Sequence, residues 1–292
     1  MRFSGSIVAI VTPWTKDLSA VDYEALKDLV EWQIASGTDG ILPAGTTGES
    51  PTLTHKEQGE LIERIVAMAG GRCQVIAGAG SNSTHESVSL AKHAREAGAD
   101  AVMAITPYYN RPTPEGLYRH FATLAENCPL PTMIYNIPSR TGVNMLPDTI
   151  ARVHKDYPHV CAVKEATGSI DQASQLIALT GMDVMSGDDS LALPVMSVGG
   201  TGVVSVIANI VPAETKAMAA AALANDFAKA REIHHRLLPL MKACFVETNP
   251  GPVKAALRIM AKCDGSMRLP MVEPKPESEK ILMEAMRKVG LV

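Results

Sequence analysis

The feature that most constrains the fold of this chain is a series of short apolar runs that recur along most of its 292 residues. Each run is continuous in Val, Ile, Leu, Ala or Met rather than alternating with polar residues. This pattern is typical of strands that are buried on both faces of a parallel sheet. It predicts eight strands, at residues 7–11, 40–43, 75–77, 101–105, 132–135, 160–164, 184–186 and 202–206.

Helical sequence separates these predicted strands. Thr54 and Glu57 have the spacing of a capping box, and Pro114 and Pro147 suit the first turn of a helix. The Ala-Gly pairs at residues 69–70 and 97–98 are typical of helix ends. The predicted helices between strands include residues 22–36, 54–68, 84–97, 114–127 and 147–155.

Eight strands that alternate with helices predict an α/β fold of the (β/α)8 TIM-barrel type. A doubly wound parallel sheet is the alternative fold, but it typically has a Gly-rich turn after its first strand. Here Val11 is followed by Thr-Pro-Trp. After residue 211 the strand pattern stops, and helices are predicted at residues 213–224, 226–246, 252–261 and 277–289. We therefore predict a barrel domain over residues 1–224 and a small C-terminal helical region over residues 225–292.

Composition and charge exclude several classes of protein. The chain has 27 Lys and Arg against 31 Asp and Glu, without a basic stripe, so nucleic acid is not expected as a partner. The five cysteines are far apart and never form a C-x-x-C pair, which favours a reducing cytoplasm over a disulfide framework. No secretory leader is apparent, and no apolar segment approaches about 20 residues. We expect a soluble cytoplasmic protein with no membrane contact.

No metal site is predicted. The eight histidines include no H-x-H or H-x-x-x-H pair. His234 and His235 are neighbours on a predicted helix, so their side chains point to different faces, and we expect both at the surface.

In a barrel the active site lies at the carboxyl ends of the strands, so the polar residues that follow each apolar run are the candidates. Lys164 ends the sixth predicted strand, with Val-Cys-Ala-Val before it. Partial burial lowers the pKa of a lysine, and the neutral amine can attack a carbonyl carbon to form a Schiff base. The alternative is an ion pair with a carboxylate such as Glu165. The other polar groups predicted at the same rim favour the catalytic interpretation.

Four further residues at this rim complete the candidate site. Tyr135 ends the fifth strand beside Lys164, and its phenol could relay protons or simply pack under a loop. Thr46 and Thr47 lie between glycines, where hydroxyl and backbone N–H groups can bind a small carboxylate, or cap the next helix. Arg140 lies in a predicted loop and suits a bidentate carboxylate contact, or a place at the surface.

Four motifs in chain order resemble the dihydrodipicolinate synthase family. This family belongs to the pyruvate-dependent class I aldolases, which also include N-acetylneuraminate lyase. The resemblance runs from end to end, and its motifs are Gly-Thr-Thr-Gly-Glu at residues 45–49, Tyr-Asn-Ile-Pro-Ser-Arg-Thr-Gly at 135–142, Lys-Glu-Ala at 164–166 and Ser-Gly-Asp-Asp at 186–189.

The resemblance implies a role for each matching residue. Lys164 would form an imine with pyruvate, and no other cofactor is implied. Tyr135, Thr46 and Tyr109 would form a proton relay, with Tyr109 reaching in from a neighbouring subunit of a homo-oligomer, a dimer of dimers. Thr47 would bind the pyruvate carboxylate, and the backbone at Gly187 and Val204 would line the pocket, although relatives often have isoleucine at the latter position.

The resemblance also implies the reaction and its second substrate. The pyruvate enamine would attack the aldehyde of L-aspartate 4-semialdehyde, in the committed step toward diaminopimelate and lysine. Arg140 corresponds to the group that binds the semialdehyde carboxylate, whereas sialic acid lyases typically have an apolar residue there. An N-acetylneuraminate lyase or a 2-keto-3-deoxygluconate-type aldolase is the first alternative. A non-catalytic barrel that binds a ligand is the second.

A regulatory site for L-lysine is the last feature that the resemblance implies. Glu86 would pair with an amino group of lysine, and Tyr108 would connect this site to Tyr109. Pro51 stands where alanine is common, and Gln58 where lysine-sensitive relatives often have histidine, so weaker inhibition is expected. The residues that match the lysine-site pattern are Ser50, His55, Asn82, Glu86 and Tyr108.

Overall fold

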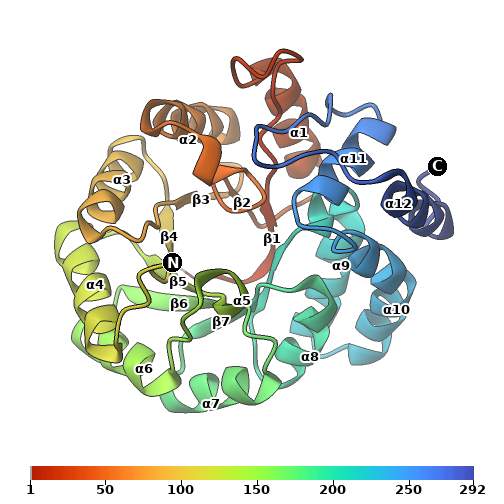
Figure 1. Ribbon diagram of the computed structural model, residues 1–292. Helices are drawn as coiled ribbons and strands as arrows, with labels where there is room; N and C mark the ends of the chain where they lie inside the picture. Colours follow the sequence, from red (N-terminus) through yellow and green to blue (C-terminus); the bar gives the residue numbers. More distant parts are fainter. Residues whose placement is uncertain (1) are drawn as a thin grey trace.

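The chain folds into a closed barrel of eight parallel strands that pair in chain order, with the last strand beside the first. A computed structural model describes residues 2–292 (Figure 1). The predicted fold class is therefore confirmed. The strands are β1 (Gly5–Ala9), β2 (Gly40–Leu42), β3 (Gln74–Gly78), β4 (Ala101–Ile105), β5 (Thr132–Asn136), β6 (Val160–Glu165), β7 (Asp183–Ser186) and β8 (Gly202–Ser205).

Helices form a ring around the strands, and the short helix α5 lies inside that ring (Figure 1). The C-terminal helices pack beside the barrel, with α10 against α9 and α12 against both α10 and α11. The helices are α1 (Tyr23–Ala35), α2 (His55–Ala69), α3 (Thr84–Glu96), α4 (Pro114–Asn127), α5 (Pro138–Thr141), α6 (Pro147–Asp156), α7 (Ile170–Thr180), α8 (Ala192–Ser197), α9 (Pro212–Leu223), α10 (Phe227–Ala243), α11 (Gly251–Ile259) and α12 (Pro276–Lys288).

The helix signals in the sequence correspond to real caps. Thr54 caps α2, since its hydroxyl accepts from the Glu57 N–H while the Glu57 carboxylate accepts from the Thr54 N–H. Gly70 ends the same helix in the left-handed conformation, with φ 55°. Pro114 and Pro147 are the first residues of α4 and α6.

Three sequence predictions need correction. The first strand spans Gly5–Ala9 rather than residues 7–11, because the Val11 N–H donates to the Asn209 side chain instead of to a neighbouring strand. Arg140 lies in the helical turn α5 and not in an irregular loop. His234 is buried, since it shares the inner face of α10 with Ala230 and Leu237. His235 is exposed, as expected.

The inside of the barrel is filled by side chains from alternate strand positions, which form one apolar cluster that includes Phe3, Leu42, Met133, Tyr135, Met185 and Val204. Along β6, Ala162 belongs to this inner cluster, whereas Val163 packs toward the surrounding helices. The alternation therefore directs the next residue, Lys164, into the barrel.

Within residues 2–292, no helix is both long and apolar enough to cross a membrane.

Candidate active site

Lys164 lies in the barrel mouth beside Tyr135. The two residues are paired across β5 and β6, and the Lys164 ammonium nitrogen is 4.2 Å from the centre of the Tyr135 ring. The side chain is buried, and burial lowers the pKa of Lys164 to about 8, although the charge of Asp189 partly opposes this shift. About a tenth of the amine is then neutral at pH 7, far more than for an ordinary lysine, and the neutral form is what a nucleophilic amine requires.

The carboxylate that influences Lys164 is Asp189 and not its sequence neighbour Glu165. Asp189 is buried and accepts hydrogen bonds from the Ser205 hydroxyl at 2.5 Å and the Val206 N–H at 2.9 Å. Burial nevertheless raises its pKa to about 6. Glu165 points the other way, where its carboxylate accepts from the Thr167 N–H at 2.8 Å on the side of α7. The strand alternation therefore separates Glu165 from the Lys164 amine.

Tyr135 is a protonated phenol at neutral pH. Burial raises its pKa to about 12, against the lowering effects of the Arg140 charge and of a hydrogen bond with Thr46. Thr46 lies in the loop after β2 and Tyr135 on β5, so two predicted relay groups from strands that are not adjacent in the barrel meet here. A neutral phenol in a hydrogen bond with a hydroxyl can pass a proton without carrying a lasting charge.

Thr47 and Arg140 are connected by a residue that the sequence analysis missed. The Asn249 side-chain N–H donates to the Thr47 hydroxyl at 3.0 Å, and the Arg140 guanidinium donates to the Asn249 backbone carbonyl at 3.2 Å. Asn249 lies just before α11, in the segment Thr-Asn-Pro-Gly-Pro. Pro and Gly residues such as those around it are typical of a loop, but nothing in the sequence indicates that this loop lies at the barrel mouth.

Gly187 and Val204, the two residues predicted to line the pocket, both lie near the barrel interior. A Cβ atom at Gly187 would come within 2.7 Å of the Ala166 Cβ and 3.1 Å of two carbons of the Lys164 side chain, so a larger residue here would require these groups to shift. Val204 is buried inside the barrel in the same cluster as Tyr135. Of the two, Gly187 lies directly beside the Lys164 side chain.

Tyr109 does not reach this site within one chain. Its side chain is 89% exposed, and its backbone φ of 72° is unusual for a residue with a side chain. The site formed by one subunit therefore contains Lys164, Tyr135 and Thr46 but lacks the third predicted relay group.

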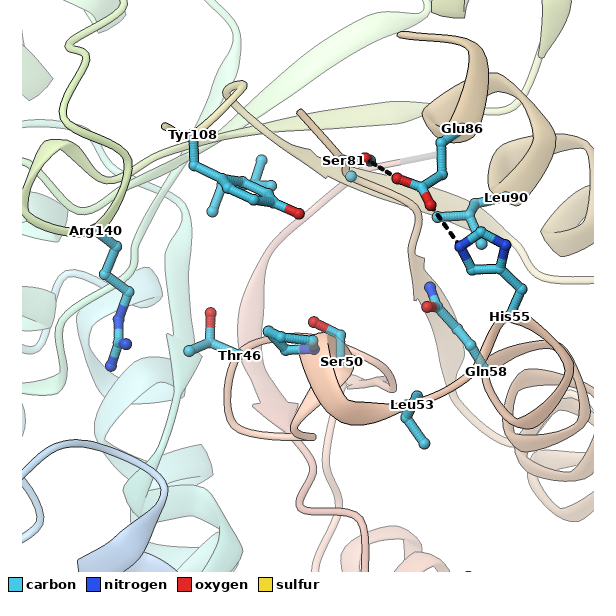
Figure 2. A pocket seen from close by; sticks show the side chains of 13 residues that line it. Thr46, Ser50, Leu53, His55, Gln58, Ser81, Glu86, Leu90, Tyr108 and Arg140 are labelled. Carbon is cyan, nitrogen blue, oxygen red and sulfur yellow. Dashed lines mark hydrogen bonds and ion pairs between the residues drawn. The ribbon is translucent and has the colours of Figure 1, made fainter. Parts of the chain in front are cut away.

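A cavity of about 320 Å3 connects the rim with the predicted lysine site. Thr46 and Arg140 lie at one side of it, and His55 and Glu86 at the other (Figure 2). Ser50 and Tyr108 also line the cavity. Of the five predicted lysine-site residues, Asn82 is the one outside this lining, and its backbone carbonyl accepts from the Asn110 side chain at 2.8 Å.

Glu86 presents a charged carboxylate to this cavity. It accepts a hydrogen bond from the Ser81 hydroxyl and pairs with the His55 ring nitrogen at 2.6 Å (Figure 2). These two contacts, Ser81 first, lower the pKa of Glu86. Gln58 also lines the cavity, but its side-chain N–H already donates to the Gly78 carbonyl at 2.9 Å.

Within residues 2–292, no three His, Cys, Asp or Glu side chains form a group that could bind a metal ion.

Comparison with known proteins assigns the family. The family model described as the dihydrodipicolinate synthetase family matches residues 2–289. The chain belongs to this family. A 4-hydroxy-tetrahydrodipicolinate synthase from Oleidesulfovibrio alaskensis is 48% identical to it over 294 aligned positions, which cover 100% of both chains. The chain is thus similar over its whole length to an enzyme of the dihydrodipicolinate synthetase family.

Two solved structures show what similar dihydrodipicolinate synthases bind. A chloride-inhibited enzyme from Acinetobacter baumannii, complexed with pyruvate, is 42% identical, with a TM-score of 0.96 and coverage of 99% of each chain. An enzyme from Cyanidioschyzon merolae with lysine bound is 39% identical, with a TM-score of 0.97 and coverage of 99% of each chain. These ligands belong to those two proteins.

Proposed function

We propose that this chain catalyses the condensation of pyruvate with L-aspartate 4-semialdehyde, giving 4-hydroxy-tetrahydrodipicolinate. The observation that carries the proposal is the buried Lys164 amine, with a pKa of about 8, beside the Tyr135 phenol. The names of the full-length relatives support the same reaction. The reaction is the committed step toward diaminopimelate and lysine.

The neutral Lys164 amine attacks the keto carbon of pyruvate, and loss of water gives an imine. This step needs a proton donor and acceptor at one carbon, which the pair of Tyr135 and Thr46 supplies. Thr47 binds the pyruvate carboxylate. Loss of a methyl proton converts the imine into an enamine, whose carbon attacks the semialdehyde aldehyde. Cyclisation by the semialdehyde amino group then releases the lysine side chain.

Arg140 distinguishes this reaction from those of other pyruvate aldolases. A sialic acid lyase or a 2-keto-3-deoxygluconate-type aldolase would use the same lysine and tyrosine, but its second substrate is a sugar rather than an amino acid. Arg140 lines the cavity beside Thr46 and offers a cation for a second carboxylate. A non-catalytic binding protein has no need of a lysine with a lowered pKa.

Borohydride trapping tests the proposal directly. Pyruvate and borohydride should attach a reduced three-carbon adduct to Lys164, and Lys164→Ala should remove the labelling. An adduct at another lysine would overturn the mechanism. A panel of aldehydes with constant pyruvate then identifies the second substrate, and activity with sugar aldehydes but not with aspartate semialdehyde would favour the aldolase alternative.

We further propose that the Glu86 end of the cavity binds L-lysine as a feedback inhibitor. The negative carboxylate of Glu86 suits an ammonium group, and the Ser50 and Tyr108 hydroxyls offer further polar contacts. The exposed Tyr109 supports a homo-oligomer in which this residue completes the site of a neighbouring subunit, within a dimer of dimers.

A further inference from the structure

The Asn249 amide is oriented with its nitrogen toward the Thr47 hydroxyl, and its buried oxygen has no hydrogen-bond partner within residues 2–292. The amide nitrogen of Asn249 donates and the Thr47 hydroxyl oxygen accepts, at 3.0 Å, and both residues are buried. An amide N–H cannot accept, so the hydroxyl proton of Thr47 points away from Asn249. A hydroxyl that accepts one hydrogen bond is polarised and becomes a better donor in a second one. The geometry thus prepares Thr47 to donate to an incoming anion.

The backbone of the same residue contacts the other carboxylate-binding group. Arg140 donates to the Asn249 carbonyl at 3.2 Å, which leaves its other N–H groups for a ligand. One residue of the C-terminal region thus contacts the groups assigned to the carboxylates of both substrates. The Asn249 side chain donates to Thr47, and the Asn249 backbone carbonyl accepts from Arg140.

A buried ion pair fixes the position of Asn249 relative to the loop that carries Thr47. Lys254, in the first turns of α11, lies 2.5 Å from the Glu49 carboxylate, and both side chains are almost inaccessible to solvent. Glu49 is two residues beyond Thr47, and Lys254 is five beyond Asn249. The loop after β2 and the start of α11 are therefore joined at two points. Thr47 and Asn249 cannot separate without disturbing a buried charge pair.

We propose that Asn249 is a positioning residue for pyruvate, which sets the Thr47 hydroxyl as a donor toward the substrate carboxylate. The inference rests on the proposed function, because it uses pyruvate as the ligand of Thr47. It adds a residue from outside the eight barrel strands to the substrate-binding groups. It also assigns a role to the C-terminal region in binding the first substrate.

Two substitutions distinguish the direction of the Asn249–Thr47 hydrogen bond from the mere presence of a contact between the two residues. Asn249→Ala removes the bond but leaves the Thr47 proton free, so the KM for pyruvate should rise roughly five- to tenfold, the loss expected for one ordinary hydrogen bond. Asn249→Asp is nearly isosteric, but its carboxylate can only accept, so Thr47 would donate to it and not to pyruvate. The Asp variant should therefore bind pyruvate more weakly than the Ala variant.

The Asp variant also gives a readout that a purely structural role would not move. Protonation restores a donor at position 249, so the ratio of its pyruvate KM to that of the parent should fall as the pH is lowered. A second test combines Asn249→Ala with Thr47→Val, where the Asn249 substitution should add little further loss. Fully additive losses, or pyruvate binding by the Asp variant equal to that of the parent at neutral pH, would overturn the inference.

Controls keep this test separate from folding and from the proposed function. Asn127→Ala removes a partly buried amide of α4 that bonds only to the Thr123 carbonyl of its own helix, and it should leave the pyruvate KM unchanged. Thermal unfolding confirms that each variant is folded. If the parent itself is not labelled by pyruvate and borohydride, the proposed function fails. If the parent is labelled and the Asn249 variants bind pyruvate like the parent, only the present inference fails.

Discussion

The chemistry at Lys164 depends on the balance between burial and a nearby carboxylate. The barrel interior disfavours the ammonium form, while Asp189 favours it, and burial has the larger effect. The result is an amine that is partly neutral at physiological pH yet close enough to its pKa to regain a proton. Such a group suits a reaction in which the amine is first a nucleophile and later a protonated leaving group.

The pKa of about 8 predicts the pH dependence of imine formation. The rate of borohydride-trapped labelling at low pyruvate should rise about tenfold per pH unit below pH 8 and level off above it, because only the neutral amine reacts. Glu165→Gln should leave this midpoint unchanged, since Glu165 faces α7. A labelling rate that does not change between pH 6 and 8 would contradict the assigned state of Lys164.

Arg140 should affect the second substrate rather than the first. Loss of a cation that binds a buried carboxylate costs about 2–5 kcal/mol, so Arg140→Ala should lower kcat/KM for aspartate semialdehyde by roughly 30-fold or more. Labelling by pyruvate should survive. Arg140→Lys retains the charge without the bidentate geometry, so its kcat/KM for aspartate semialdehyde should lie between those of the parent and of Arg140→Ala. Equal loss of labelling and turnover would indicate a structural arginine instead.

At the scale of elements, the sequence patterns were most informative where one local signal decides the structure. The capping box at Thr54 and the prolines at 114 and 147 placed helix starts correctly, because caps depend on a few neighbouring residues. The bounds of β1 were wrong because the strand register is set by pairing with β8, which is distant in sequence. Helix α7 was not singled out, although Ser169 caps it by accepting from the Gln172 N–H.

The same distinction applies to the candidate site. Lys164 and Tyr135 could be placed from the sequence because each lies one residue before the end of its own strand and strand alternation directs both inward. Asn249 and Lys254 could not, because their contacts with Thr47 and Glu49 join positions about 200 residues apart. A local sequence pattern cannot predict which loop of the barrel the C-terminal segment will contact.

The junction of α11 with the loop after β2 predicts a large stability effect. Lys254→Met leaves the Glu49 carboxylate buried and without its cation, which should lower the free energy of unfolding by about 3–5 kcal/mol. Urea denaturation measures this loss. The double variant with Glu49→Gln should lose less than Lys254→Met alone, because no isolated charge remains. Lys229→Met, at an exposed position on α10, is the control and should change the free energy of unfolding little. An equally small change for Lys254→Met would contradict the predicted role of the buried ion pair.

At the scale of the whole molecule, one cavity joins two residues of the proposed active site to the proposed lysine site. Thr46 and Arg140 share its lining with His55 and Glu86, so a ligand at one end changes the shape and charge available at the other (Figure 2). This continuity offers a physical route for inhibition without a large rearrangement of the barrel.

Inhibition by L-lysine should therefore depend on Glu86. Millimolar lysine should slow the steady-state rate of the parent, and Glu86→Thr should relieve this inhibition while the uninhibited rate stays nearly unchanged. Glu96→Thr, on the exposed last turn of the same helix α3, should leave inhibition intact. A parent enzyme that lysine does not slow, or a Glu86 variant that it slows equally, would remove lysine from this cavity.

The exposed position of Tyr109 makes the assembly itself testable. If Tyr109 acts in the site of a partner subunit, Tyr109→Phe and Lys164→Ala should each be nearly inactive alone, since every site then lacks one group. A hybrid dimer of the two variants contains one site with an intact Lys164 and an intact Tyr109 from the other chain. Random reassociation at equal amounts makes about half of the dimers hybrid, so about a quarter of the parent activity should return.

A relay confined to one chain gives a different result in this mixing experiment. Neither chain of the hybrid would then contain both groups, and the mixture would stay as inactive as its components. Tyr108→Phe is the matched control for loss of a neighbouring phenol, because Tyr108 lines the cavity of its own chain and this variant keeps both Lys164 and Tyr109. Since Tyr109 is 89% exposed in a single chain, and Lys164 is buried, we expect activity to return. Full activity of diluted, monomeric subunits would contradict the shared site.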